Sequence, residues 1–366
     1  MRPFFLAAIS CAFCVSSALH TDAAAAQSPN KHLVRLYKPT LLKNPDTQFL
    51  FYPRDLNNSG QLVGTTDIPD NFLSSHAASW RNGRVTFQRE LPGATSSDGI
   101  ALNDHGDFVA VDVVNGLGGA NASVHAVLGY NGKLTDLGMP KGNTDFDPVG
   151  LNNRRQVIGI GSDYTGYLWS QGRFSPLAVA PGGRNPFPTA INNAGSVAGW
   201  EVVPADSMTT QAALWRDGSV ELLGVLPDTT DSEAEALNDF DHVVGVSYGG
   251  IEKAFLWRDG TMTALPPVVA GESTEALGIN DWDQVTGFEI SATDFQQFPV
   301  IWENGRATRL ADLIRPADKA RMDPAIALRS AYSINEWGQI LVYASPVNPD
   351  WYGDYFYLLT PVYEWQ

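Results

Sequence analysis

Apolar and polar residues alternate along most of this chain with a period of two, in short runs that end in turn-forming residues. A period of two places successive side chains on opposite faces of an extended strand, whereas a helix repeats every ~3.6 residues. The clearest example runs from Leu237 to Gly245 and continues from Ala254 to Gly260, where two strand-like runs each end in a tight turn. The pattern predicts an all-β chain built from hairpins.

The same pattern returns seven times along the chain. Each copy opens with Leu or Ile followed by an asparagine, at Asn57, Asn103, Asn152, Asn192, Asn238, Asn280 and Asn335. The spacings between these positions are 46, 49, 40, 46, 42 and 55 residues. A repeat of roughly 40–50 residues that contains several strands is typical of β-propellers, in which each repeat forms one blade.

A short polar turn follows each of these asparagines. Most copies carry Gly three residues after the Asn, as at Gly60 and Gly195, because this place in the turn requires a positive φ. The third copy has Arg155 there, and since Arg fits this backbone poorly we expect a shifted turn in that copy. We expect the Asn side chains to satisfy local backbone groups rather than to bind a ligand.

The second half of a copy is a strand that ends on Trp and precedes an Asn-Gly or Asp-Gly turn. Such a dipeptide between apolar runs is a strong hairpin signal, and a fourth strand-like run follows it. We expect the Trp side chains to pack between blades, at Trp80, Trp169, Trp215, Trp257 and Trp302. Four strands per repeat and seven repeats predict a seven-bladed β-propeller of four-stranded antiparallel blades.

The two ends of the chain are expected to close the ring. The last copy lacks a clear fourth strand, and residues 33–37 form an isolated apolar run before the first copy. We expect this N-terminal strand to pair into the last blade, because closure removes an exposed strand edge. The long spacing between copies six and seven contains residues 310–322, which favour a short helix interrupted at Pro316.

Residues 1–26 have the features of a secretory signal peptide: Arg2, an apolar stretch, and three small residues before Gln27. Residues 27–366 show no linker and are expected to form a single propeller domain of seven repeats. Both cysteines, Cys11 and Cys14, lie in the signal, so the mature chain has no thiol for a disulfide or a metal site. We expect a secreted protein, extracellular or periplasmic, without a transmembrane segment.

The chain is acidic, with a formal net charge of −16 and a pI near 4.7. This balance argues against nucleic acid or an anionic membrane as a partner, and we expect a monomer. The pairs Asp239/Asp241 and Asp281/Asp283 are spaced like the start of a calcium loop, but the remaining ligand positions are missing. We therefore expect no cofactor and keep calcium as the alternative.

Two short elements recur in phase along the chain. One is Ile/Leu-Asn-x-x-Gly-x-Val-x-Gly, and the other is the His-Ala-Ala-Ser-Trp of residues 76–80, with relatives at 125–128 and 253–257. Together they resemble the HAF repeats of bacterial extracellular proteins, over about residues 55–360. The resemblance implies secretion and a repeat fold. It implies no particular activity and supplies no catalytic residues.

Strand direction separates two faces of the predicted ring. The first-to-second and third-to-fourth turns are short and alike, and both emerge on one face, which we call the short-turn face. The other connections are long and differ between copies; they form the long-loop face, where binding sites on rigid scaffolds usually lie. We expect ligand contacts where the innermost strands begin at the long-loop face, at Tyr52, Arg54, Asp98, Asp147, Arg184, Phe187, Glu235, Glu275, Arg329 and Tyr332.

Aromatic side chains beside carboxylates and Arg suit a sugar or a peptide ligand. The sequence therefore favours a binding module for a carbohydrate or an extracellular protein. The alternative is a polysaccharide-active enzyme, a lyase or glycosidase that uses these carboxylates, Arg and Tyr332, because acid–base catalysis requires geometry rather than a motif. A structural component of an envelope or matrix is a third interpretation.

Overall fold

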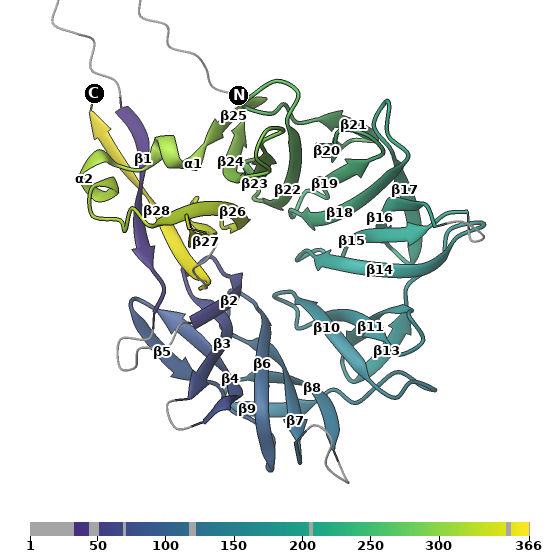
Figure 1. Ribbon diagram of the computed structural model, residues 1–366. Coiled ribbons are helices and arrows are strands. Elements are labelled where there is room, and N and C mark those ends of the chain that lie inside the picture. The colour runs from purple at the N-terminus through teal and green to yellow at the C-terminus, as the bar shows by residue number, and fades with distance from the viewer. Residues whose placement is uncertain are drawn as a thin grey trace, which may run out of the picture.

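The computed structural model describes residues 33–43, 51–68, 71–116, 122–204, 208–348 and 353–365. The strands there form seven antiparallel sheets of four strands each, arranged in a ring (Figure 1). The prediction of an all-β, seven-bladed propeller is confirmed. The proposed signal peptide, residues 1–26, lies outside the described residues. No helix in the described part of the chain is long and apolar enough to span a membrane.

The strands of blades 1 to 4 follow chain order from the axis outward. Blade 1 contains β2 (Phe51–Leu56), β3 (Leu62–Ile68), β4 (Asn71–Arg81) and β5 (Arg84–Phe87). Blade 2 contains β6 (Ala94–Leu102), β7 (Phe108–Val114), β8 (Ser123–Tyr130) and β9 (Lys133–Asp136). Blade 3 contains β10 (Phe146–Leu151), β11 (Val157–Gly161), β12 (Gly166–Ser170) and β13 (Arg173–Pro176). Blade 4 contains β14 (Arg184–Ile191), β15 (Val197–Val202), β16 (Thr210–Arg216) and β17 (Ser219–Gly224).

Blades 5 and 6 repeat this order, and blade 7 differs in its outermost strand. Blade 5 contains β18 (Asp231–Leu237), β19 (Val243–Tyr248), β20 (Lys253–Arg258) and β21 (Thr261–Ala264). Blade 6 contains β22 (Ser273–Ile279), β23 (Val285–Ile290), β24 (Gln297–Glu303) and β25 (Arg306–Arg309). Blade 7 contains β26 (Ile326–Ile334), β27 (Ile340–Pro346), β28 (Tyr355–Trp365) and β1 (Leu33–Leu41).

The N-terminal strand β1 closes the ring, as the sequence predicts. It pairs antiparallel with β28 from Leu33 opposite Trp365 to Leu41 opposite Tyr357, so the first and last described strands lie side by side (Figure 1). Tyr37 is fully buried in the core of blade 7. Without β1, the outer edge of β28 would present unpaired backbone groups to solvent.

The short helix predicted between copies six and seven is present, and it is interrupted at Pro316 as expected. Helix α1 (Leu310–Leu313) and helix α2 (Pro316–Lys319) join β25 to β26. Leu310 is buried in the same core as Tyr37, and the amide of Arg315 donates to the Tyr37 carbonyl at 2.9 Å. The insertion therefore fastens the closing strand to the ring.

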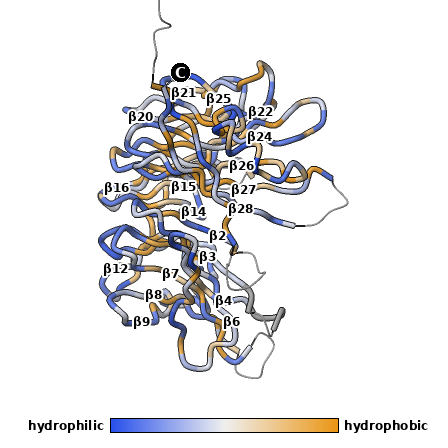
Figure 2. The backbone as a smooth tube through the Cα atoms, turned by 90° about the vertical axis from the view of Figure 1, so that its left-hand side faces the viewer, coloured by the Kyte–Doolittle hydropathy of each residue, from blue (hydrophilic) through white to orange (hydrophobic). Residues whose placement is uncertain are grey.

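Apolar side chains of neighbouring blades pack together in shared clusters. Along the backbone, hydrophobic stretches alternate with hydrophilic ones (Figure 2). The expected packing of the repeated Trp is confirmed, because all five are buried. Trp257 of blade 5, for example, packs in one cluster with Leu214 and Leu223 of blade 4. In blade 2 the Trp position is Gly129, and the ring of Phe108 on the neighbouring strand occupies the space beside it.

The expectation of a shifted turn at Arg155 is wrong. The Arg155 amide donates to the Asn152 carbonyl at 3.0 Å, as the Gly60 amide does to Asn57, and Arg155 adopts φ +58°. Its guanidinium pairs with the Asp107 carboxylate at 2.8 Å and lies 4.7 Å from the centre of the Tyr130 ring. These contacts offset the cost of a left-handed backbone for a residue with a side chain.

Removing β1 should open the ring. We expect a variant that lacks Leu33–Leu41 to melt at least about 5 °C lower than the full chain, because it loses a buried Tyr and a complete strand pairing. It should also aggregate through the exposed edge of β28. Differential scanning calorimetry and light scattering measure both effects, with a chain that begins at residue 31 as the control. Equal melting temperatures for the two truncations would contradict closure by β1.

Candidate functional site

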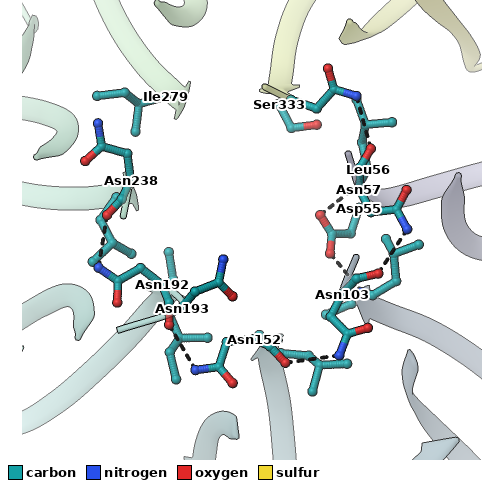
Figure 3. A pocket seen from close by; sticks show the side chains of 18 of the residues that line it. Asp55, Leu56, Asn57, Asn103, Asn152, Asn192, Asn193, Asn238, Ile279 and Ser333 are labelled. Carbon is teal, nitrogen blue, oxygen red and sulfur yellow. Dashed lines mark hydrogen bonds between the residues drawn. The ribbon is translucent and has the colours of Figure 1, made fainter. Parts of the chain in front are cut away.

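The turn asparagines form a closed ring around the channel at the short-turn end. Each side-chain carbonyl accepts the amide of the residue four places later, at 2.9–3.1 Å. Each side-chain amide donates to the main-chain carbonyl of the asparagine in the next blade, at 2.9–3.1 Å. Figure 3 shows the links that run from Asn57 through Asn103, Asn152 and Asn192 to Asn238. The last of these bonds runs from Asn335 to Asn57 at 3.0 Å and completes the circle. The expected role as turn groups is confirmed, and the link between blades is an addition to it.

The residue after each asparagine forms a second closed ring. Its side-chain oxygen accepts the main-chain amide of the equivalent residue in the preceding blade, at 2.8–3.1 Å. The members are Asn58, Asp104, Asn153, Asn193, Asp239, Asp281 and Glu336. Asn, Asp and Glu all offer an oxygen acceptor at this position, so the bond tolerates either charge state. We call this set the turn-tip ring.

Two cavities follow the axis of the propeller. A cavity of about 580 Å³ occupies the channel and is lined by both rings at the short-turn end. A second cavity of about 900 Å³ lies at the long-loop mouth, where β2 and β6 begin. Four residues line both cavities and therefore lie where they meet: Arg54, Glu235, Leu277 and Tyr332. We call these four residues the collar.

Five of the predicted site residues line the mouth cavity, although they come from different blades. They are Tyr52, Arg54, Asp98, Glu235 and Tyr332. Arg54 donates to the Asp98 carboxylate at 2.9 Å, and the Thr65 hydroxyl donates to the other oxygen of Asp98. Because Arg54 and Asp98 are both solvent-accessible, this pair contributes at most about 1 kcal/mol to stability. Its main effect is to hold both groups in fixed positions at the cavity wall.

An aromatic row borders the mouth cavity along blades 1 and 7. The ring centres of Tyr52 and Phe356 are 6.1 Å apart, those of Phe356 and Tyr343 are 5.6 Å apart, and those of Tyr343 and Tyr332 are 6.2 Å apart. Phe356 and Tyr343 lie on β28 and β27, and sequence reasoning missed them because it considered only the innermost strands. Their signal was the excess of aromatic residues in the last copy.

Carboxylates gather on the blade 5 and blade 6 side of the collar. Burial, together with the negative charges of Glu275 and Glu233, raises the pKa of Glu235 to about 7. Burial, together with Glu252 and Glu233, raises the pKa of Glu275 to about 7. The Tyr248 hydroxyl lies 3.5 Å from the Glu233 carboxylate, and burial raises the pKa of Tyr248 well above its usual range. Glu235 and Glu275 can therefore each gain or lose a proton near neutral pH.

The remaining predicted residues do not line either of the two axial cavities. Phe187 stacks on Trp200 with ring centres 4.6 Å apart. Arg329 donates to the Ser345 hydroxyl at 2.9 Å and also to Gln296, so it links blades 6 and 7. Asp147 is exposed on β10, and Arg184 begins β14. The structure thus places part of the predicted set together and spreads the remainder around the ring.

No group of three or more His, Cys, Asp or Glu side chains that could hold a metal ion occurs within the described ranges. The two acidic pairs with calcium-like spacing have other contacts. Asp241 accepts from the Asn192 side chain at 2.8 Å, and Asp283 accepts from the Asn238 side chain at 3.3 Å. Both carboxylates therefore contribute to the contacts between blades.

The fold is similar to that of several solved structures. No protein-family model matches the chain, and no curated protein matches its sequence. A prolyl endopeptidase structure is 9% identical with a TM-score of 0.54, and the match covers 90% of this chain and 50% of that one. An oligogalacturonate lyase from Vibrio parahaemolyticus is 12% identical with a TM-score of 0.52, covering 90% and 98%. YCF48 bound to a D1 peptide is 11% identical with a TM-score of 0.51, covering 88% and 97%.

These similarities concern the propeller architecture alone, because the identities are far below those at which function transfers between proteins. This chain spans about half the length of the endopeptidase that it matches. The site must therefore be interpreted from its own residues.

Breaking one link of the asparagine ring should destabilise the whole propeller. Asn57→Ala removes the acceptor of the Ser59 and Gln61 amides and one of the two donors to the Asn103 carbonyl, and we expect a loss of about 2–4 kcal/mol. Urea unfolding followed by Trp fluorescence measures this loss. The control is Asn304→Asp, an exposed turn position where other blades carry Asp. A loss below about 1 kcal/mol for Asn57→Ala would show that the ring is dispensable.

The carboxyl groups of Glu235 and Glu275 should make stability depend on pH. Their pKa values are higher in the folded state than in the unfolded chain, so their contribution is complete at acidic pH and is lost as pH rises through about 7. We expect the melting temperature of the native chain to fall between pH 5 and pH 8 by more than that of Glu235→Gln/Glu275→Gln. Calorimetric melts across this range test the difference between the two proteins. Parallel curves would show that neither Glu titrates abnormally.

Proposed function

We propose that this protein is a secreted binding module for a neutral glycan, and that the mouth cavity is its site. The observation that carries the proposal is the aromatic row beside fixed polar groups in a cavity of about 900 Å³. The C–H faces of a sugar ring pack on aromatic rings, while its hydroxyl groups need fixed donors and acceptors. The mouth cavity offers both on neighbouring walls.

The charges around the cavity favour a neutral sugar over a uronate. The Asp98 carboxylate already neutralises Arg54, which is the only Arg or Lys on the wall of this cavity among the described residues. Glu235 lines the same cavity, and the charges of Glu275 and Glu233 act on it. A polyuronate would therefore meet net negative charge, which disfavours its binding.

A glycosidase is the second candidate function, and the carboxyl groups of Glu235 and Glu275 favour it. A general acid at neutral pH needs a raised pKa, and both Glu235 and Glu275 have a pKa of about 7. In such an enzyme Glu235, which lines the cavity, would donate a proton to the leaving oxygen. The binding module requires only that the neutral carboxyl donates a hydrogen bond.

Export belongs to the same proposal. Residues 1–26 would direct secretion, and the in-phase motifs that resemble HAF repeats are consistent with an extracellular or periplasmic location. No metal or other cofactor is needed for glycan binding at this site.

A panel of neutral oligosaccharides and oligogalacturonates tests the proposal by isothermal titration calorimetry and a reducing-end assay. We expect a neutral oligosaccharide to bind without turnover, and Tyr332→Ala to weaken it by about three- to tenfold through the loss of a stacking face. Tyr164→Asn removes a more exposed aromatic ring on blade 3, outside the mouth cavity, and should leave affinity unchanged. New reducing ends that disappear in Glu235→Gln would establish the glycosidase. Binding confined to oligogalacturonates would overturn the charge argument.

A further inference from the structure

Three large aromatic side chains project from the short-turn face into solvent. Trp282, Trp337 and Phe240 are 74%, 73% and 65% exposed, and they lie at the turn tips of the consecutive blades 5, 6 and 7. The same place in blades 1 to 4 holds Ser59, His105, Arg154 and Ala194. Gathered exposed aromatic groups on one part of a soluble protein mark an interaction surface, whereas single ones need no explanation.

An acidic member of the turn-tip ring directly precedes each of these aromatics. Asp239 precedes Phe240, Asp281 precedes Trp282, and Glu336 precedes Trp337. Three of the four members in blades 1 to 4 are asparagines. Negative charge and aromatic surface are therefore concentrated on the same side of the ring. We call these six residues the acid–aromatic arc.

The arc stands on rigid backbone. The amides of Phe240, Trp282 and Trp337 donate to the asparagine ring at 3.0–3.1 Å. The amides of Asp239 and Asp281 donate to the next member of the turn-tip ring at 2.9 and 3.1 Å. The turns are thus already ordered before any partner arrives, which lowers the entropic cost of binding.

The carboxylates of the arc lack a positive partner. Within the described ranges, no Arg, Lys or His forms an ion pair with Asp239, Asp281 or Glu336. The nearby side chains of His242 and Arg258 pair with Asp283 instead. Burial and the neighbouring carboxylates raise the pKa of Asp281 and of Glu336, so like charges already disfavour each other here. A bound cation would relieve that repulsion.

We propose that the acid–aromatic arc is a second binding surface, which holds the Arg or Lys side chains of a basic polypeptide segment. A guanidinium stacks over the face of Trp or Phe while it donates hydrogen bonds to a carboxylate beside the ring. The arc places an acidic residue directly before an exposed aromatic residue three times in succession. A second copy of this chain is a poor occupant, because the net charge of −16 repels itself. A neutral glycan would use the rings without the charges.

The test uses a fluorescein-labelled oligoarginine peptide as the probe, followed by fluorescence anisotropy and by the emission of the exposed Trp. We expect saturable binding that weakens with added salt, and no binding of an oligoglutamate peptide of equal length. Trp282→Ala/Trp337→Ser should weaken binding about tenfold. Blades 4 and 1 carry Ala194 and Ser59 at these places, so the turns should fold unchanged.

The charge variant is Asp239→Asn/Asp281→Asn. Asn occupies three of the seven equivalent positions and accepts the same backbone amide there, so the ring should persist while two charges are lost. We expect about tenfold weaker binding and a smaller dependence on salt. The matched control is Asp217→Asn/Asp259→Asn, which removes two exposed charges from outer turns of the same face, where other blades carry Asn. It should change affinity by less than about twofold.

Melting temperatures within about 2 °C of the native chain establish that each variant is folded. If the arc variant and its control lose the same affinity for oligoarginine, then binding depends only on the net negative charge of the protein, and the proposal is overturned. If a neutral oligosaccharide binds the arc, and binds Asp239→Asn/Asp281→Asn with the same affinity, then the partner is a glycan and not a polypeptide. If the native chain self-associates in gel filtration and Trp282→Ala/Trp337→Ser does not, then the partner is a second copy of the chain and not a basic polypeptide.

Discussion

The hydrogen bond from each turn asparagine to the carbonyl of the next blade's asparagine is the interaction on which the other features depend. One such bond contributes only about 1 kcal/mol, but here seven of them form a closed circle. Each asparagine is also buried, so every side-chain donor and acceptor must have a partner. The circle therefore fixes the distance between adjacent blades at the axis, while the Trp and other apolar side chains fix it farther out.

This ring explains why the two faces of the propeller differ. At the short-turn face, the asparagine ring and the turn-tip ring hold every blade in the same way, so only the outward-pointing tips can vary. At the long-loop face the described residues form no such ring, and neighbouring blades contribute different side chains to the mouth cavity. Variation on a rigid support is the usual arrangement of a binding site. The molecule has one variable mouth and one regular face whose tips carry the acid–aromatic arc.

The propeller architecture itself leaves the activity open. A prolyl endopeptidase, an oligogalacturonate lyase and a peptide-bound YCF48 all share it with this chain at 9–12% identity. Chemistry in such folds is decided by the few groups at the axis. Here these groups are one neutralised Arg–Asp pair, two glutamates with pKa values of about 7, and a row of aromatic rings. The proposal of an uncharged, hydroxyl-rich ligand rests on that combination.

The sequence alone determined the fold, because its signals act over a few residues. The period-two alternation defined strands, Asn-Gly and Asp-Gly dipeptides defined turns, and an unpaired run at residues 33–37 defined the closing strand. The turn at Arg155 was predicted wrongly from local signals, because it depends on contacts with Asp107 and Tyr130 in the neighbouring blade. Only the tertiary structure decided the site, because ring geometry determines which side chains meet. It brought Arg54, Asp98, Glu235 and Tyr332 to one cavity, added Phe356 from β28, and placed Asp147, Phe187 and Arg329 outside it.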